Sequence, residues 1–118
     1  MPVSNEEKEF VTYVVDLMQS IGPVRAKRMF GGHGIFLEGL MFGLIADSVL
    51  YLKVDKETEM DFKIRGLEAF TYNKKGKEFK MSYYQAPEEA IEDDEEMNSW
   101  ANKAYGVALK AASKKQNK

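Results

Sequence analysis

The sequence predicts an α+β fold of two layers, in which an antiparallel meander sheet carries helices from both ends of the chain. Apolar residues recur at helical spacing near each terminus. Between residues 24 and 54, four strand-like segments follow one another, and the turns between them are too short for parallel crossovers. The expected order is one helix, four strands, a second helix, two strands and a final helix.

The first helix is expected to begin at Ser4, because Ser4 and Glu7 have the spacing of a capping box. Gly22-Pro23 is expected to end it, since glycine suits the left-handed cap and proline blocks continuation. The residues between them form one apolar stripe, which must pack on the sheet: Phe10, Val14, Leu17, Met18 and Ile21.

The four strands of the predicted meander cover residues 24–30, 34–37, 40–46 and 49–54, and Gly31-Gly32-His33-Gly34 is expected to turn between the first two. The third strand is apolar throughout, which is typical of a strand covered on both sides. Simple alternation turns one set of its side chains to one face: Leu40, Phe42, Leu44 and Ala46. Met41 and Ile45 would then point the other way.

The fourth strand alternates more clearly. Leu50, Leu52 and Val54 are expected to point inward, and Tyr51 and Lys53 to lie on the mixed face.

The second half of the chain predicts a short helix, a hairpin and a long helix. Asp55 can cap a helix over residues 56–64, and strands at 70–72 and 77–84 are joined by a turn at 73–76. Pro87 suits the first position of a helix, and a break near Asp93-Asp94 precedes the final helix. Residues 113–118 form a basic tail that is expected to fray.

Composition describes one globular domain over residues 1–118, with an ordered core at about 4–112. The chain is 44% hydrophobic and 31% charged, and its net charge of -2 argues against a surface built wholly for phosphate backbones. It has no cysteine, which excludes disulfides, thiolate catalysis and thiol-rich metal sites. The polar N-terminus and the short apolar runs favour a cytoplasmic protein.

Three sequence features that resemble chemical sites have simpler interpretations. The glycine run at 31–34 precedes a strand rather than a helix, so it favours a bend or bulge over a phosphate cradle. His33 is the only histidine, and one histidine without cysteines does not make a zinc site. The acidic run 88–96 holds seven carboxylates without the spacing of a calcium loop, which favours a solvated helix start.

Two surfaces are candidates for binding. If both long helices cover one face of the sheet, the other face shows apolar side chains to a partner or to a second copy of the chain, with Phe42, Tyr51 and Lys53 as candidate contacts. The alternative is that the short helices and the 70–84 hairpin cover this face within the monomer.

Basic residues interleaved with aromatic ones predict direct nucleic-acid binding as the second hypothesis. The candidate contacts are Arg25, Lys27, Arg28, Lys74, Lys75 and Lys77. Lysines also protect an exposed hairpin edge from aggregation, so this cluster has a structural explanation as well.

The chain resembles the N-terminal domain of the TfoX/Sxy family from about Ser4 to Ala112. The most specific matching element is Met29-Phe-Gly-Gly-x-Gly34. Further matches are Gly22-Pro23, Gly39-x-Met-Phe42, Leu50-Tyr-Leu-Lys53, Gly66-Leu-Glu-x-Phe70, Met81-x-Tyr-Tyr84, Pro87-Glu-Glu89 and Trp100-Ala101. The resemblance implies the same α+β order, similar to that of secretion chaperones.

The resemblance also implies a role in regulating competence for DNA uptake. Longer members act as transcriptional coactivators and carry a second, C-terminal helical domain that this sequence does not include. The family offers no catalytic residues, cofactor or metal site to map onto this chain. We therefore expect a non-enzymatic regulatory or protein-interaction module.

Overall fold

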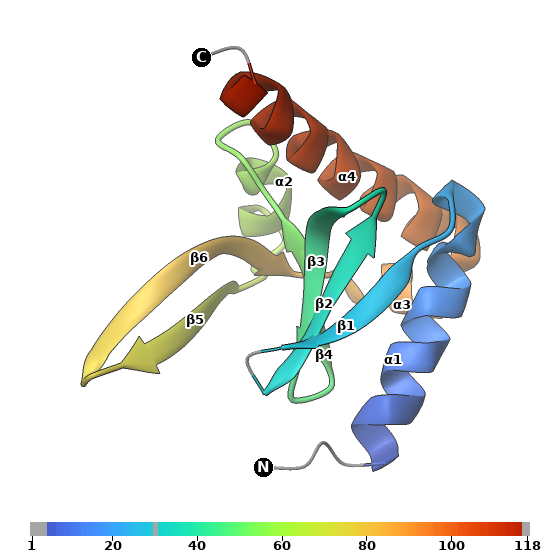
Figure 1. Ribbon diagram of the computed structural model, residues 1–118, viewed down its shortest axis with the longest axis horizontal. Coiled ribbons are helices and arrows are strands. Elements are labelled where there is room, and N and C mark those ends of the chain that lie inside the picture. The colour runs from blue at the N-terminus through green and yellow to red at the C-terminus, as the bar shows by residue number, and fades with distance from the viewer. Residues whose placement is uncertain (1–4, 30, 117–118) are drawn as a thin grey trace.

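The computed structural model describes residues 5–29 and 31–116, and it contains a six-stranded antiparallel sheet in the order β1-β2-β3-β4-β6-β5. The sheet is accompanied by four α-helices, of which α1 and α4 lie on one side of it (Figure 1). The strands are β1 (Arg25–Met29), β2 (Gly32–Leu37), β3 (Leu40–Ala46), β4 (Val49–Lys53), β5 (Ala69–Lys74) and β6 (Lys77–Gln85). The predicted α+β class is confirmed.

The first helix, α1 (Asn5–Met18), buries Val11, Val14 and Met18 against the sheet. A short 3₁₀ turn, η1 (Gln19–Ile21), follows it and ends at Gly22, where the sequence predicts the stop. Ser4, the predicted cap, lies outside the described residues.

The meander uses the tight turns that its sequence predicts. Glu38 and Gly39 both have positive φ angles, 53° and 79°, as a two-residue hairpin turn requires. The predicted turn at 31–34 is shorter than expected. Gly31 lies in the turn with a φ angle of 75°, but β2 already begins at Gly32, and His33 pairs with both Arg28 and Ile45. Gly32 and Gly34 therefore belong to the sheet.

A β-bulge in β3 overturns the predicted alternation of that strand. Ile35 pairs with Gly43 and the next residue, Phe36, pairs with Met41, which leaves Phe42 as an extra residue. A bulge puts two neighbouring residues on one side of the sheet. Phe42 therefore joins Ile45 in the core, whereas Leu44 takes the opposite side with Met41.

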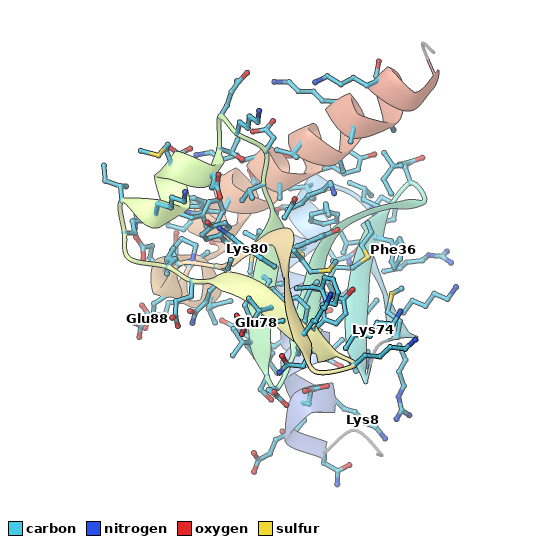
Figure 2. The ribbon with its side chains drawn as sticks, turned by 90° about the vertical axis from the view of Figure 1, so that its left-hand side faces the viewer. Lys8, Phe36, Lys74, Glu78, Lys80 and Glu88 are labelled. Carbon is cyan, nitrogen blue, oxygen red and sulfur yellow. The ribbon has the colours of Figure 1, made fainter. Side chains whose placement is uncertain are left out.

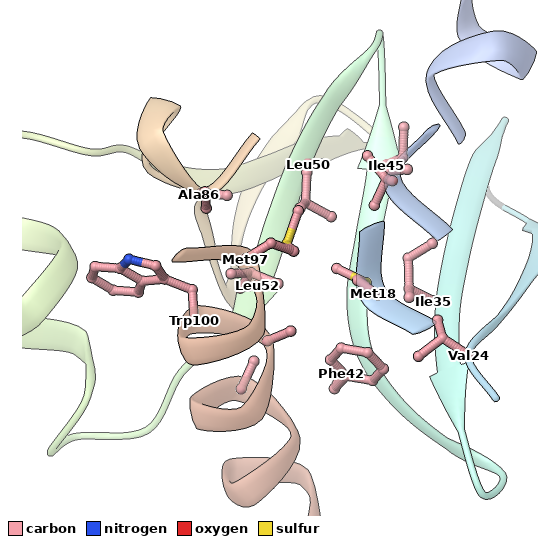
Figure 3. Close-up of a cluster of buried hydrophobic side chains, with 14 of the residues drawn as sticks. Met18, Val24, Ile35, Phe42, Ile45, Leu50, Leu52, Ala86, Met97 and Trp100 are labelled. Carbon is pink, nitrogen blue, oxygen red and sulfur yellow. The ribbon is translucent and has the colours of Figure 1, made fainter. Parts of the chain in front are cut away.

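The core lies between the sheet and the helices α1 and α4 (Figure 3). The side chains that are most completely buried come from every layer of the fold, and they include Met18, Ile35, Phe42, Leu52, Phe62 and Met97. Leu50, Leu52 and Val54 point into this core, as their alternation predicts. Helix α4 packs along β3 and β4, so it covers the middle of the sheet.

The remaining helices are α2 (Glu59–Lys63), α3 (Glu88–Glu92) and α4 (Asp94–Gln116). The predicted second helix is shorter than expected, because residues 56–58 form a turn before it. Pro87 precedes α3 as predicted, and α4 continues past Ser113, where the sequence predicts a frayed tail. Within the described part of the chain, no helix is long and apolar enough to cross a membrane.

Candidate functional site

The sheet has an outer face, defined here as the side turned away from α1 and α4. Leu44, Tyr51 and Gln85 are paired across β3, β4 and β6, and Lys53 is paired with Tyr83. Directly paired residues share one side of a sheet, so these side chains lie on the outer face. Tyr51 and Lys53 are where the sequence places them, opposite the inward-facing Leu50 and Leu52.

Aromatic contacts organise the centre of the outer face. The Tyr51 ring meets the Phe70 ring edge to face, with centroids 5.0 Å apart. The ammonium group of Lys53 lies 5.1 Å from the centroid of the Tyr83 ring. No helix covers this centre (Figure 1), where Tyr51, Phe70 and Lys53 are half-buried and Tyr83 is 6% exposed.

The two tyrosines of this centre stay neutral at physiological pH. Burial raises the pKa of the Tyr83 phenol. Burial also raises the pKa of Tyr51, with smaller contributions from the carboxylates of Asp47 and Glu68. The charge in the centre of the outer face is therefore that of Lys53.

Phe42 is not on this face, so its assignment as an interaction residue is wrong. Its side chain is 0% exposed, and its ring meets that of Tyr105 in α4 at a centroid distance of 5.7 Å. The bulge in β3 is the reason, because it turns Phe42 toward the helices. Leu44 replaces it on the outer face and is 3% exposed.

Two half-buried side chains of the outer face were not identified from the sequence: Phe36 and Met41. They converge over Gly34, where an added Cβ would lie 2.8 Å from a Phe36 ring carbon and 3.3 Å from the Met41 sulfur. Any larger residue than glycine would collide with them. The signal in the sequence is alternation within the predicted strand 34–37, which puts Gly34 and Phe36 on the same face.

The predicted basic residues of β1 are divided between the two sides of the sheet. Arg25 pairs with Phe36 and Lys27 with Gly34, which places both on the outer face. Arg28 pairs with His33 and takes the other side, toward α1. Arg28 therefore lies on the opposite side of the sheet from Arg25 and Lys27.

The other predicted cations lie on a projecting ribbon. We call residues 71–80 the arm; all of them are exposed, and they form the outer part of the β5–β6 hairpin (Figure 2). Lys74 pairs with Lys77, and Lys75 lies in the turn between them. The structure thus gathers Lys74, Lys75 and Lys77 at the tip, which stands away from β1 (Figure 1).

His33 has a structural environment between the sheet and α1. Its Nδ1 lies 3.6 Å from Oε2 of Glu7, and the backbone N–H of Ser48 donates to Oε1 of the same carboxylate at 3.1 Å. Glu7 is thereby held beneath the β3–β4 turn. This contact ties α1 to the sheet, and it does not bring His33 to a nucleophile.

A groove of about 910 Å³ opens between α2, the end of α4 and the strands β4 and β6. Its carboxylates have partners: Tyr84 donates its hydroxyl to Oε2 of Glu59 at 2.7 Å, and Lys80 Nζ lies 3.7 Å from the same atom. The Tyr84 hydrogen bond first, and then Lys63 and Lys80, lower the pKa of Glu59. A carboxyl that stays ionised in this way is poorly suited to general acid catalysis near neutral pH.

Among residues 5–29 and 31–116, no group of three or more histidines, aspartates or glutamates could hold a metal ion. The described surface has two features suited to binding: the aromatic pair Tyr51 and Phe70 on the outer face, and the basic tip of the arm.

Comparison with known proteins yields one family and one curated relative. The family model described as the TfoX N-terminal domain matches residues 16–108. The DNA transformation protein TfoX1 of Aliivibrio fischeri is 31% identical over 86 residues, which cover 73% of this chain and 39% of that protein. The aligned part thus spans about two fifths of the relative's length.

Proposed function

The chain belongs to the TfoX N-terminal domain family, and from this premise we propose that it is a non-enzymatic regulatory module of competence for DNA uptake. It acts by binding a protein through the outer face of its sheet, and a second copy of the chain is the partner to test first. The similarity to a relative named a DNA transformation protein supports the proposed role in competence.

The observation that carries the proposal is the helix-free outer face. Two helices cover the inner face, whereas the outer face has an aromatic centre, Tyr51 with Phe70 and Tyr83 with Lys53. Apolar surface flanked by polar residues is typical of protein interfaces, and aromatic residues dominate their energetics.

The absence of catalysis is part of the proposal. The sequence contains no cysteine and a single histidine, and that histidine contacts Glu7 in the interior. Nucleophilic catalysis needs a nucleophile and a base within hydrogen-bond reach of one another. Regulation by association requires neither.

Sedimentation or light scattering tests this proposal. The wild-type chain should give the mass of a dimer at high concentration, and Tyr51→Glu should reduce it to one chain, because a carboxylate would be desolvated in the interface. Tyr72→Glu, on the arm, places the same charge outside the outer-face centre and should leave the dimer intact. A wild-type mass of one chain at every concentration contradicts self-association.

A further inference from the structure

The arm exposes a stacked pair of aromatic rings. Tyr72 and Phe79 are directly paired across β5 and β6, with ring centroids 5.5 Å apart and an interplanar angle of 27°. The two side chains are 41% and 42% exposed. Cross-strand packing steadies the ribbon, but it leaves flat ring surface in contact with water.

Lysines continue the same face of the arm. Lys74 follows Tyr72 by two residues and pairs with Lys77, which precedes Phe79 by two residues, so alternation places this pair beside the rings. Lys75 lies in the turn. None of the ion pairs found among the described residues involves Lys74, Lys75 or Lys77.

The other face of the arm has a different character. Asn73 pairs with Glu78, and Lys80 lies 3.7 Å from Glu59, so its charge is already opposed. The arm thus has one face with rings and unopposed cations, and one face with polar or paired groups.

This combination favours a ligand with flat apolar groups and regularly spaced negative charge. Unpaired bases stack on exposed aromatic side chains, and lysines hold the phosphates between them. A duplex hides the faces of its bases, and an acidic peptide offers charge without a flat partner. We propose that the arm binds single-stranded nucleic acid, with bases stacked on Tyr72 and Phe79 and phosphates held by Lys74, Lys75 and Lys77.

The site goes beyond the proposed protein association and uses a different part of the surface.

Fluorescence anisotropy with labelled oligothymidine of about 15 nucleotides tests the proposal. Phe79→Ala and Tyr72→Ala should each weaken binding by about tenfold, the loss typical of one stacked base. Asn73→Ala, on the opposite face of the arm, is the matched control and should bind as the wild type does. Oligouridine of the same length distinguishes RNA from DNA as the source of the strand.

Salt dependence tests the lysines separately. For single strands each phosphate contact contributes about 0.7 to the slope of log affinity against log salt, so K74Q/K77Q should reduce the slope by about 1.4. Lys56→Gln removes the same kind of charge from the exposed turn before α2 and should leave the slope unchanged. Trp100, which is 7% exposed in the core, gives an emission spectrum that verifies folding of each variant.

Three results would overturn the inference. They are equal affinity for the matching duplex, unchanged affinity in both aromatic variants, and displacement of the strand by polyglutamate at the same concentration of charge. None of them bears on the dimer mass, so failure here is distinguishable from failure of the proposed function.

Discussion

Phe42 is a fully buried residue of the core. Its ring is enclosed by β3 and Tyr105 of α4, so Phe42→Ala should lower the free energy of unfolding by about 3–5 kcal/mol. Phe79→Ala, on the exposed arm, should lower it by less than about 1 kcal/mol. Urea unfolding followed by Trp100 fluorescence measures both. Equal losses in the two variants would contradict the placement of Phe42 in the core.

The face on which a side chain lies was predictable in strands whose apolar and polar residues alternate, but not in strands that are apolar throughout. Tyr51 and Lys53 lie on the outer face as predicted, because Leu50, Leu52 and Val54 mark the inner face of the same strand. In β3 every position is apolar, so the pattern carries no information about the bulge that turns Phe42 inward. The assignment of Phe42 failed for that reason.

At the scale of elements, the turn before α2 is closed by Asp55. The backbone N–H groups of Glu57 and Thr58 donate to Oδ1 of Asp55 at 3.0 and 2.9 Å, and the Thr58 hydroxyl accepts from the Asp55 N–H at 3.0 Å. This reciprocal pair resembles a capping box. Asp55→Ala should therefore cost about 1 kcal/mol near neutral pH, whereas Lys56→Ala should cost much less.

The contribution of Asp55 depends on pH in a defined direction. Hydrogen bonds from backbone N–H groups, that of Thr58 first, lower the pKa of its carboxyl below the usual value. A lowered pKa in the folded state adds stability above the ordinary pKa of aspartate, and this stability is lost as the pH falls through the lowered value. The difference between wild type and Asp55→Ala should shrink over that acidic range in urea titrations. A difference that grows on acidification would contradict the cap.

The kinds of elements were predictable from hydrophobic period and turn residues, whereas some of their ends were not. Pro87 and Gly22 mark their boundaries by backbone chemistry, and the structure follows them. Helix α4 runs past Ser113 because nothing in its last residues breaks a helix. The glycines at 32 and 34 suggested a turn, but both lie inside β2. An added Cβ would overlap the Ile45 carbonyl oxygen at Gly32, and would lie 2.5 Å from the Met29 sulfur at Gly34.

For the molecule as a whole, stability should fall from the centre of the sheet to the arm. β3 is hydrogen-bonded to β2 and β4 and covered by α4, whereas every residue of the arm is exposed. Backbone amides of β3 should therefore exchange with deuterium most slowly and those of residues 71–80 among the fastest. Similar protection in β3 and in the arm would contradict this gradient of stability.

The gross architecture follows from the sequence because each long helix has one apolar stripe and the strands between them are joined by short turns. The grouping of the cations follows only in part. Arg25 and Lys27 share one face of β1, as strand alternation predicts. The position of the arm lysines does not follow, because β5 and β1 are at opposite edges of the sheet and the order of its strands depends on tertiary packing.

The extra residue in β3 also has a consequence for folding fidelity. A strand that is apolar on both faces can pair with its neighbours in several registers of similar free energy. The contact of Phe42 with Tyr105 favours one of these registers. A shift of β3 by one residue would turn the Phe42 ring to the outer face and remove this contact. The bulge therefore fixes the register in which β3 pairs within the meander.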